Sequence, residues 1–359
     1  MKKFLFWIFF VGFLCVGCEN VQLSVENQSS DIKQLSSSYV GKKVSFACWN
    51  VQTFFDAKID GNEYSEFKKE ESWNSGKYRQ RLERLCEVMN SLNADIFVFE
   101  EIESLGVVQD ISNFLTNGSW LNSKKWNYAC FSRNCGSAIG CAVFSRFPIK
   151  ELTVHNVDVR IYANEQPSSR PIMQVCLEID KKDLVLFVNH WKSKSGGEVE
   201  TEIWRDWQEA LLGERLVRDF SFSGKNAYIL CGDFNRSAED FVCDFEGAFI
   251  ESEIGGKFEC ADANVVLRTF GQGKSEFVCV YSPWFGKSGG FKTEKGSYFY
   301  KGSWERIDNI FSFESLKISG FMVESEGNLA KEDGSPFRYS VYNGEGYSDH
   351  FPLVCSLLL

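Results

Sequence analysis

Short apolar runs recur along the chain, and polar or turn-forming residues bound each of them. Runs of about four to eight apolar residues are typical of strands that are buried on both faces. The pattern predicts strands at residues 44–51, 95–99, 138–144, 172–179, 184–189, 228–231, 307–311 and 352–357. The folded body is therefore expected to contain a core built mainly of β-sheet.

Two segments have the apolar spacing of an amphipathic helix. The first helix is predicted over about 77–92 from Arg79, Leu82, Leu85, Val88 and Met89. The second is predicted over about 199–219 from Trp204, Trp207, Ala210, Leu211 and Leu216. The Gly- and Lys-rich stretch 286–302 indicates a surface loop. Because strands outnumber helices and no long linker divides the body, we expect one α/β domain with two packed sheets.

The N-terminus has the pattern of an export signal. Lys2 and Lys3 precede an apolar run at 4–17, which is shorter than the roughly 20 residues of a membrane-spanning helix and suits a signal peptide. The letters LCVGC at 14–18 resemble a relaxed bacterial lipobox, in which Cys18 would become the lipid-bearing first residue. A plain secretory signal or an uncleaved anchor is the alternative.

The expected organisation is a signal peptide at 1–17, a lipid-anchored flexible tether at 18–42 and one folded domain at 43–359. The tether is rich in Ser, Gln and Asn, as flexible linkers are. We expect an exported, membrane-anchored lipoprotein that faces the periplasm or the cell exterior.

The charge balance limits the ways in which the chain could bind nucleic acid. The 359 residues include 39 Lys and Arg against 49 Asp and Glu, a formal net charge of −10. Bulk attraction to nucleic acid is disfavoured by this balance, although a locally basic cleft is not. Lys192, Lys194, Lys287, Lys292 and Lys295 form either such a rim or ordinary solvated charges.

Cysteine and histidine usage argues against a zinc enzyme. Of the 13 cysteines, no two pairs have zinc-site spacing, and the three histidines do not form a His-rich motif. Cys130 and Cys135 bracket a short loop and are the best disulfide candidates.

Polar residues gather where the predicted strands end. Acid, amide and imidazole side chains in such positions can form a site for a hard metal ion together with a proton-transfer base. The residues concerned are Asn50, Glu100, Glu101, His190, Asp233, Asn235, Asp308, Asp349 and His350.

These residues lie in the motifs CWNVQTFFD, DIFVFEEIE, LFVNHWKSKSGG, ILCGDFN, ERIDNIF and GYSDHFPLV. In this order, the motifs resemble the endonuclease/exonuclease/phosphatase superfamily, from about Val44 to the C-terminus. The stretches RPIMQV and GSYFYKGSWERID are similar to a bacterial exported branch of that family. The resemblance implies an α/β fold, a four-layer sandwich with two mixed β-sheets flanked by helices.

The resemblance also implies a Mg²⁺ site, with Mn²⁺ as a possible substitute. Glu101 would be the main ligand, and Asn50, Asp233 and Asp349 would surround the same ion. The family usually has Gln-Glu where this chain has Glu100 and Glu101. Since alternation along a strand places neighbouring side chains on opposite faces, only one of the two acids is expected to face the metal. The motif favours Glu101; if Glu100 faces inward, the assignment moves by one residue.

The catalytic roles follow from the same resemblance. His350 corresponds to the general base that activates water, and Asp308 to the carboxylate that orients it. His190, Asn235 and Arg170 correspond to groups that position the scissile phosphate. Asp233 belongs to the catalytic set as well as to the metal set.

The expected activity is Mg²⁺-dependent hydrolysis of phosphoester bonds, most simply by a monomeric nuclease or phosphodiesterase acting on DNA, anchored to a membrane by its N-terminal lipid. One alternative is a phosphatase or phospholipase C-type hydrolase acting on inositol phosphates or sphingomyelin. Another is a non-catalytic surface-binding lipoprotein that keeps the fold alone.

Overall fold

The computed structural model describes ten segments of the chain: 42–118, 125–157, 169–223, 226–243, 249–252, 256–259, 264–269, 276–286, 289–313 and 316–359. The predicted signal peptide, the lipidation site Cys18 and nearly all of the predicted tether lie outside these residues. None of the helices in the described segments has both the length and the apolar character needed to cross a membrane.

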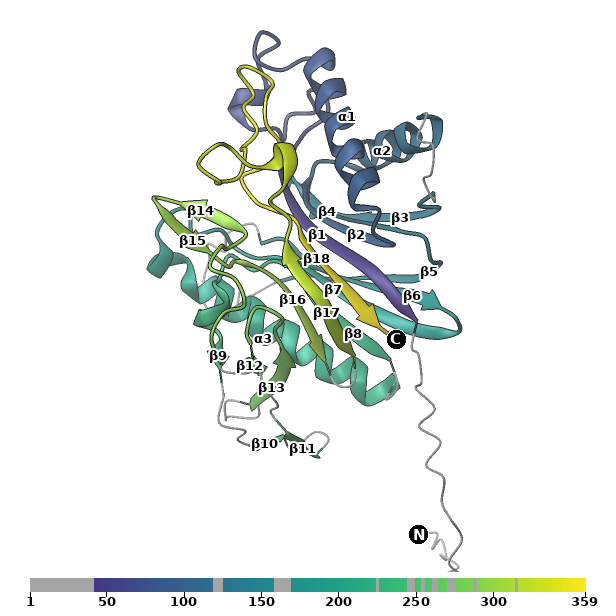
Figure 1. Cartoon of the computed structure of the whole chain (residues 1–359), viewed down its shortest axis with the longest axis vertical. Coiled ribbons are helices and arrows are strands. Elements are labelled where there is room, and N and C mark those ends of the chain that lie inside the picture. Colours follow the sequence, from purple (N-terminus) through teal and green to yellow (C-terminus); the bar gives the residue numbers. More distant parts are fainter. Residues whose placement is uncertain are drawn as a thin grey trace, which may run out of the picture. The chain divides into compact units, whose positions relative to one another are not determined.

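One sheet contains six strands in the order β17–β18–β1–β2–β4–β3 (Figure 1). Its strands are β1 (Lys43–Phe54), β2 (Ile96–Ile102), β3 (Tyr128–Ser132), β4 (Gly140–Ser145), β17 (Lys317–Val323) and β18 (Leu353–Leu358). β1 and β2 run parallel, whereas the other neighbours run antiparallel, so the sheet is mixed.

A second sheet contains eight strands in the order β5–β6–β7–β8–β16–β13–β12–β9. Its strands are β5 (Ile149–His155), β6 (Ile172–Ile179), β7 (Lys182–His190), β8 (Ala227–Asp233), β9 (Val242–Cys243), β12 (Asn264–Thr269), β13 (Glu276–Tyr281) and β16 (Asp308–Phe313). β7 and β8 are parallel inside this otherwise antiparallel sheet.

Two small hairpins and three helices complete the regular structure of the described residues. The hairpins are β10 (Phe249–Ser252) with β11 (Gly256–Glu259) and β14 (Tyr298–Tyr300) with β15 (Ser303–Glu305). The helices are α1 (Ser75–Leu92), α2 (Leu105–Asn117) and α3 (Glu198–Ser223), and short 3₁₀ turns cover Ser65–Phe67, Ala238–Asp240 and Gly327–Leu329.

The helices cover the outer faces of the paired sheets. α1 and α2 pack on the six-stranded sheet, and α3 packs on the eight-stranded sheet (Figure 1). The predicted four-layer α/β sandwich with two mixed sheets is therefore confirmed.

β1 shows how the sequence produces this layering. Because side chains alternate along a strand, Val44, Phe46 and Cys48 enter the core between the two sheets. Trp49 and Val51 instead enter the core beneath α1 and α2. One strand thus contributes an apolar face to each of two hydrophobic cores.

The predicted strands and helices all occur, but several elements were missed. α2 had a readable signal: Ser104 caps it by accepting a hydrogen bond from the Val107 backbone N–H, and Val107, Ile111 and Leu115 bury one face. The prediction of a loop over 286–302 is wrong at its C-terminal end, where the chain forms β14. Its aromatic residues pair with β15 across a tight turn.

Two further expectations need correction. Cys130 and Cys135, proposed as a disulfide, are both free thiols; Cys130 lies in β3, paired with Val143. The buried face of α3 also differs from the predicted one: Trp204, Trp207 and Leu211 are only half-buried, whereas Arg205 and Glu209 are buried.

Gly232 permits a close approach between β7 and β8. Its φ is +127°, and a Cβ placed there would lie 1.9 Å from the Asn189 carbonyl oxygen. We predict that Gly232→Ala lowers the Tm by about 3–10 °C, because both the backbone conformation and the contact become strained. Thermal unfolding followed by circular dichroism measures the change.

Gly286→Ala is the matched control. A Cβ at Gly286 would meet the Gly290 carbonyl oxygen at 3.5 Å, an ordinary van der Waals distance. An unchanged Tm for Gly232→Ala would contradict the close-approach argument.

Candidate active site

Three of the predicted residues lie in one row across the eight-stranded sheet. His190 at the end of β7 pairs in register with Asp233 at the end of β8, and Asp233 pairs with Asp308 at the start of β16. All three side chains are buried. Strand register alone therefore brings together residues that are up to 118 positions apart in the sequence (308 − 190).

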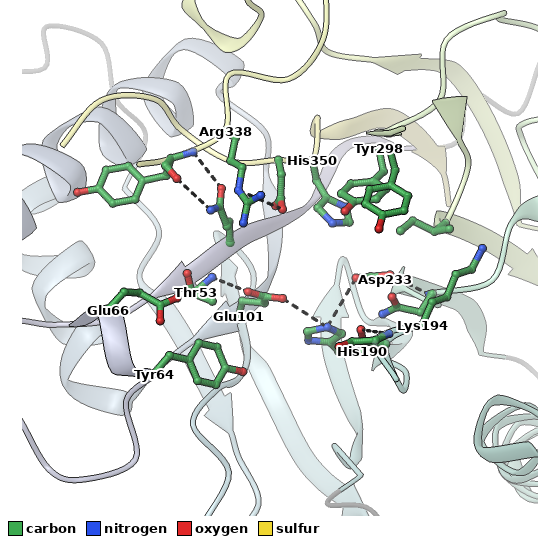
Figure 2. Close-up of a pocket in the computed structure, with 18 of the residues that line it drawn as sticks. Thr53, Tyr64, Glu66, Glu101, His190, Lys194, Asp233, Tyr298, Arg338 and His350 are labelled. Carbon is green, nitrogen blue, oxygen red and sulfur yellow. Dashed lines mark hydrogen bonds and ion pairs between the residues drawn. The ribbon is translucent and has the colours of Figure 1, made fainter. Parts of the chain in front are cut away.

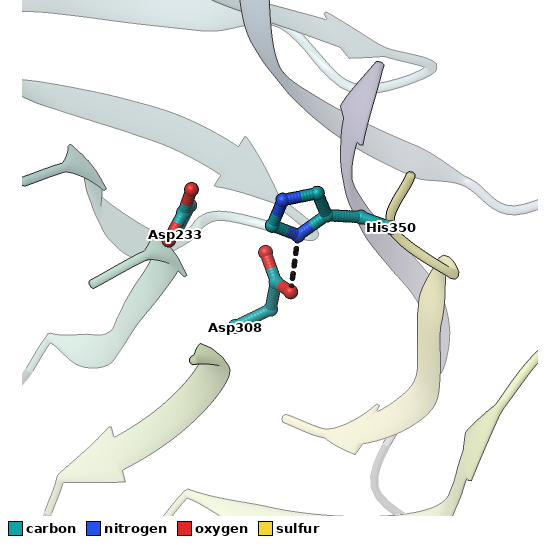
Figure 3. A group of neighbouring side chains, drawn as sticks. All are labelled: Asp233, Asp308 and His350. Carbon is teal, nitrogen blue, oxygen red and sulfur yellow. Dashed lines mark hydrogen bonds and ion pairs between the residues drawn. The ribbon is translucent and has the colours of Figure 1, made fainter. Parts of the chain in front are cut away.

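His350 reaches this row from the other sheet. It precedes β18, and its Nδ1 lies 2.8 Å from Asp308 Oδ2 (Figure 3). The His350 backbone is held by two contacts: Trp49 Nε1 donates to its carbonyl at 2.9 Å, and its N–H donates to Ser348 Oγ at 3.1 Å. Ser348 Oγ also donates to the Asn50 carbonyl at 2.6 Å. The position of His350 is thus fixed at its ring, by Asp308, and at its backbone, by Trp49 and Ser348.

The electrostatics of this pair follow from burial and from nearby carboxylates. Burial disfavours the charged ring of His350, but Asp308, Asp233 and Asp349 together raise its pKa well above the ordinary value. Burial and the Asp308 carboxylate raise the pKa of Asp233 to about 7. Asp308, Asp233 and His350 together can therefore bind and release a proton, as general acid–base catalysis requires.

Asp233, Asp308 and His350 also lie close enough together to bind a metal ion. The geometry favours another role for two of them, because the Asp308–His350 hydrogen bond already engages Nδ1 of the ring. Nε2 is then the ring nitrogen left to accept a proton. The Asp308–His350 pair could therefore transfer a proton, and the Asp233 carboxylate could bind a metal ion.

Glu101 lines the cleft at the end of β2. Its carboxylate accepts hydrogen bonds from the Thr53 backbone N–H and from Asn50 Nδ2, the latter at 3.3 Å. Asn50 Nδ2 also donates to Asp233 Oδ2 at 3.0 Å. Asn50 therefore joins an acid of one sheet to an acid of the other.

Glu101 reaches this position because the strand alternation is interrupted. The residue has φ +66°, and the pairing of β2 with β4 shifts between Glu100 and Ile102. Such a bulge adds a residue to one strand and redirects its side chain. Glu100 stays in regular alternation and is fully buried between the sheets, where Cys48 Sγ donates to it at 3.4 Å. Of the two acids, Glu101 is thus the one that lines the cleft.

His190 lies between the two candidate metal-binding acids. Its Nε2 is 3.7 Å from Glu101 Oε1 and 3.6 Å from Asp233 Oδ2 (Figure 2). Burial lowers the pKa of His190 well below its ordinary value, and Arg170 and His350 lower it further. The ring is therefore neutral near pH 7 and does not neutralise the two carboxylates.

The donor set fits a divalent cation. Within the described segments, neither Glu101 nor Asp233 forms an ion pair with a lysine or arginine; both accept a hydrogen bond from Asn50, and the neutral ring of His190 lies near both. Carboxylate oxygens are ligands that Mg²⁺ and Mn²⁺ prefer, whereas Asn50 turns its Nδ2 to the two acids and its Oδ1 accepts from the Gln52 backbone N–H at 3.0 Å. The fourth predicted ligand, Asp349, lines the same cleft, but its nearest charged partner is Arg338 at 3.9 Å.

The remaining predicted residues line the same cleft, whose volume is about 1720 Å³. Arg170 donates from Nη1 to the Trp191 carbonyl at 2.9 Å. Asn235 donates to the same carbonyl at 3.2 Å and has a left-handed backbone, φ +47°. Of the five candidate rim lysines, Lys192 and Lys194 line the cleft. Lys287 lies outside the described residues.

Sequence reasoning missed two groups beside this site. Arg236 is buried and follows Asn235, which lines the cleft. It forms ion pairs with Glu202, Asp206 and Glu209 of α3. Its position one residue after Asn235 was a usable signal. Tyr298 is the other omission: its ring centroid lies 4.6 Å from that of His350, with 33° between the planes.

Comparisons with known proteins identify the family and the fold. The model of the Endonuclease/Exonuclease/phosphatase family matches residues 45–251, which include the strands that carry Asn50, Glu101, His190 and Asp233. No curated protein sequence matches the chain.

Solved structures share the fold at low sequence identity. Truncated TDP2 from Caenorhabditis elegans is 13% identical over 88% of this chain and 98% of that chain, with a TM-score of 0.55. ANGEL2, a 2′,3′-cyclic phosphatase, is 13% identical over 89% and 96%, also with a TM-score of 0.55.

A family protein from Bacteroides thetaiotaomicron is 16% identical over 89% of this chain and 98% of that chain, with a TM-score of 0.50. The structural matches establish a common architecture, and the family match covers more than half of the sequence. The chain therefore belongs to the endonuclease/exonuclease/phosphatase family of metal-dependent phosphoester hydrolases.

Proposed function

We propose that this protein is a nuclease or phosphodiesterase that hydrolyses phosphodiester bonds of DNA by in-line attack of water. The main support is His350, which is hydrogen-bonded to Asp308 and lines a single cleft together with the Glu101 and Asp233 carboxylates (Figure 2). An oriented base next to a cation-binding acid pair is what direct hydrolysis of a phosphoester requires.

Each side chain then has a separate task. Glu101 and Asp233 would hold the divalent cation, with Asn50 positioning both carboxylates through Nδ2, and the bound cation would supply Lewis-acid stabilisation of phosphoryl charge. His350 takes a proton from the attacking water at Nε2, while Asp308 holds the ring by Nδ1 and stabilises the imidazolium that forms. His190 and Arg170 donate hydrogen bonds to non-bridging phosphate oxygens.

We further propose that the enzyme is exported and held at a membrane by a lipid on Cys18. This proposal rests on the N-terminal pattern alone. Mass spectrometry of the protein purified from membranes tests it: a diacylglyceryl or triacylated Cys18 is expected, and a soluble chain that retains residues 1–17 would contradict it.

Plasmid DNA tests the reaction class. Cleavage is expected with Mg²⁺ or Mn²⁺, is expected to stop with EDTA and to return on addition of excess metal. Release of inorganic phosphate from inositol polyphosphates, or of phosphocholine from sphingomyelin, with intact plasmid would overturn the proposed substrate. A folded protein silent on all of these substrates would point to the non-catalytic alternative.

Glu101→Gln tests the metal assignment. Loss of a carboxylate ligand is expected to raise the Mg²⁺ concentration for half-maximal activity by about 10-fold or more. Glu66→Gln is the control, since Glu66 lines the same cleft outside the acid pair. An unchanged metal requirement in Glu101→Gln would remove Glu101 from the metal site.

The proton-transfer pair is tested by His350→Ala and Asp308→Asn. Each is expected to lower kcat by about 10²–10⁴-fold, and the double variant is expected to lose little more than the worse single one, because the two residues act as a unit. His155→Gln is the control, since His155 lies on β5 and bonds to Gln174 away from the cleft. Additive losses would contradict a shared role.

The pH profile supplies a second test of the pair. The nearby carboxylates raise the pKa of His350, and the ring must be neutral to act as a base, so activity is expected to rise with pH. Asp308→Asn removes the largest of the raising interactions and is expected to move the midpoint of the acidic limb of kcat/KM to lower pH. A midpoint that stays in place would separate Asp308 from the titration of the base.

A further inference from the structure

The hairpin β14–β15 presents two tyrosines on one face. Its turn consists of Lys301 at φ +48° and Gly302 at φ +85°, positive values that suit a tight two-residue hairpin. Since side chains alternate along a strand, Tyr298 and Tyr300 share a face. Their rings lie 6.1 Å apart with 17° between the planes.

The opposite face of the hairpin anchors it to the body of the protein. Phe299 packs on Trp304 with ring centroids 4.9 Å apart, and Trp304 stacks on Phe351 at 6.1 Å. The Phe351 backbone N–H donates to the Ser297 carbonyl at 2.8 Å. The hairpin is therefore attached to the segment that carries His350.

The two tyrosines extend the catalytic site toward solvent. Tyr298 contacts the ring of His350, and Figure 2 shows the two side by side. Tyr300 follows Tyr298, and Lys301 Nζ lies 5.1 Å from the centroid of the Tyr300 ring. Both tyrosines line the cleft, and Tyr300 is 49% exposed. A tyrosine that served packing alone would be covered; this one leaves an aromatic surface open beside the reaction centre.

We propose that Tyr298 and Tyr300 form a platform on which an unpaired nucleobase of the substrate stacks, next to the scissile phosphate. This inference rests on the proposed function and specifies its substrate class as a base-bearing strand. Aromatic side chains bind bases of any sequence in this way, because every base offers a π face.

The surrounding charges favour a nucleotide over the other flat or cationic groups that aromatic rings bind. A choline headgroup also binds tyrosine rings, but the Lys301 ammonium beside Tyr300 would repel it. The same ammonium attracts the phosphates that flank a base. An inositol ring is puckered and carries a hydroxyl or phosphate on every carbon, so it offers no flat apolar face to the platform.

The test compares a single-stranded oligothymidylate with an equally long oligomer of tetrahydrofuran abasic residues, both cleaved with Mg²⁺. The measured quantity is the ratio of kcat/KM on the base-bearing strand to kcat/KM on the abasic strand. Tyr300→Ala is expected to lower this ratio by at least about 5-fold, the low end for loss of one base–aromatic stack. Tyr300→Phe is expected to keep the ratio, because the ring is retained.

Tyr128→Ala is the matched control, since Tyr128 is similarly exposed (39%) but lies on β3. If Tyr300→Ala leaves the ratio unchanged while the wild type cleaves both strands, the platform is wrong and the proposed function stands. If the wild type cleaves neither strand but hydrolyses sphingomyelin or inositol phosphates, the proposed function itself is overturned, and the platform with it.

Discussion

The hydrogen bond between Asp308 and His350 is the interaction on which the site depends. Asp308 begins a strand of one sheet, and His350 lies just before Phe351 and Pro352, which lead into a strand of the other. The Asp308–His350 pair can therefore form only if the two sheets pack in the correct register. Trp49 and Ser348 fix the same histidine through its backbone, so packing, backbone hydrogen bonding and proton transfer all constrain one imidazole.

Much of this arrangement was predictable from the sequence, because the polar residues of the site lie at the ends of strands that the apolar pattern identifies. Asn50, His190, Asp233 and Asp308 each lie at the boundary of an apolar run long enough to be identified as a strand. Side-chain alternation then places Asn50 toward the second sheet, where it contacts Asp233. The apolar pattern could not supply the strand order, which aligns His190, Asp233 and Asp308 in one row.

The features that the sequence pattern does not reveal have local physical causes. Alternation fails at Glu101 because a bulge with positive φ redirects that side chain, and nothing in the period of the sequence announces the bulge. Apolar spacing does not identify the buried face of α3, because Glu209 is buried there as an ion pair with Arg236, which follows β8. Tyr298 was overlooked because its significance comes from the contact with His350, which is 52 residues away in the chain (350 − 298).

The two faces of β1 have a consequence for how the domain unfolds. β1 contributes side chains to both hydrophobic cores. If one core loses its packing, the strand is displaced and the apolar side chains of the other core are exposed as well. The folded body should melt in one cooperative transition, with no stable half-domain that retains an intact core. For the same reason, an insertion or deletion of one residue inside β1 would turn the side chains beyond it from one core to the other.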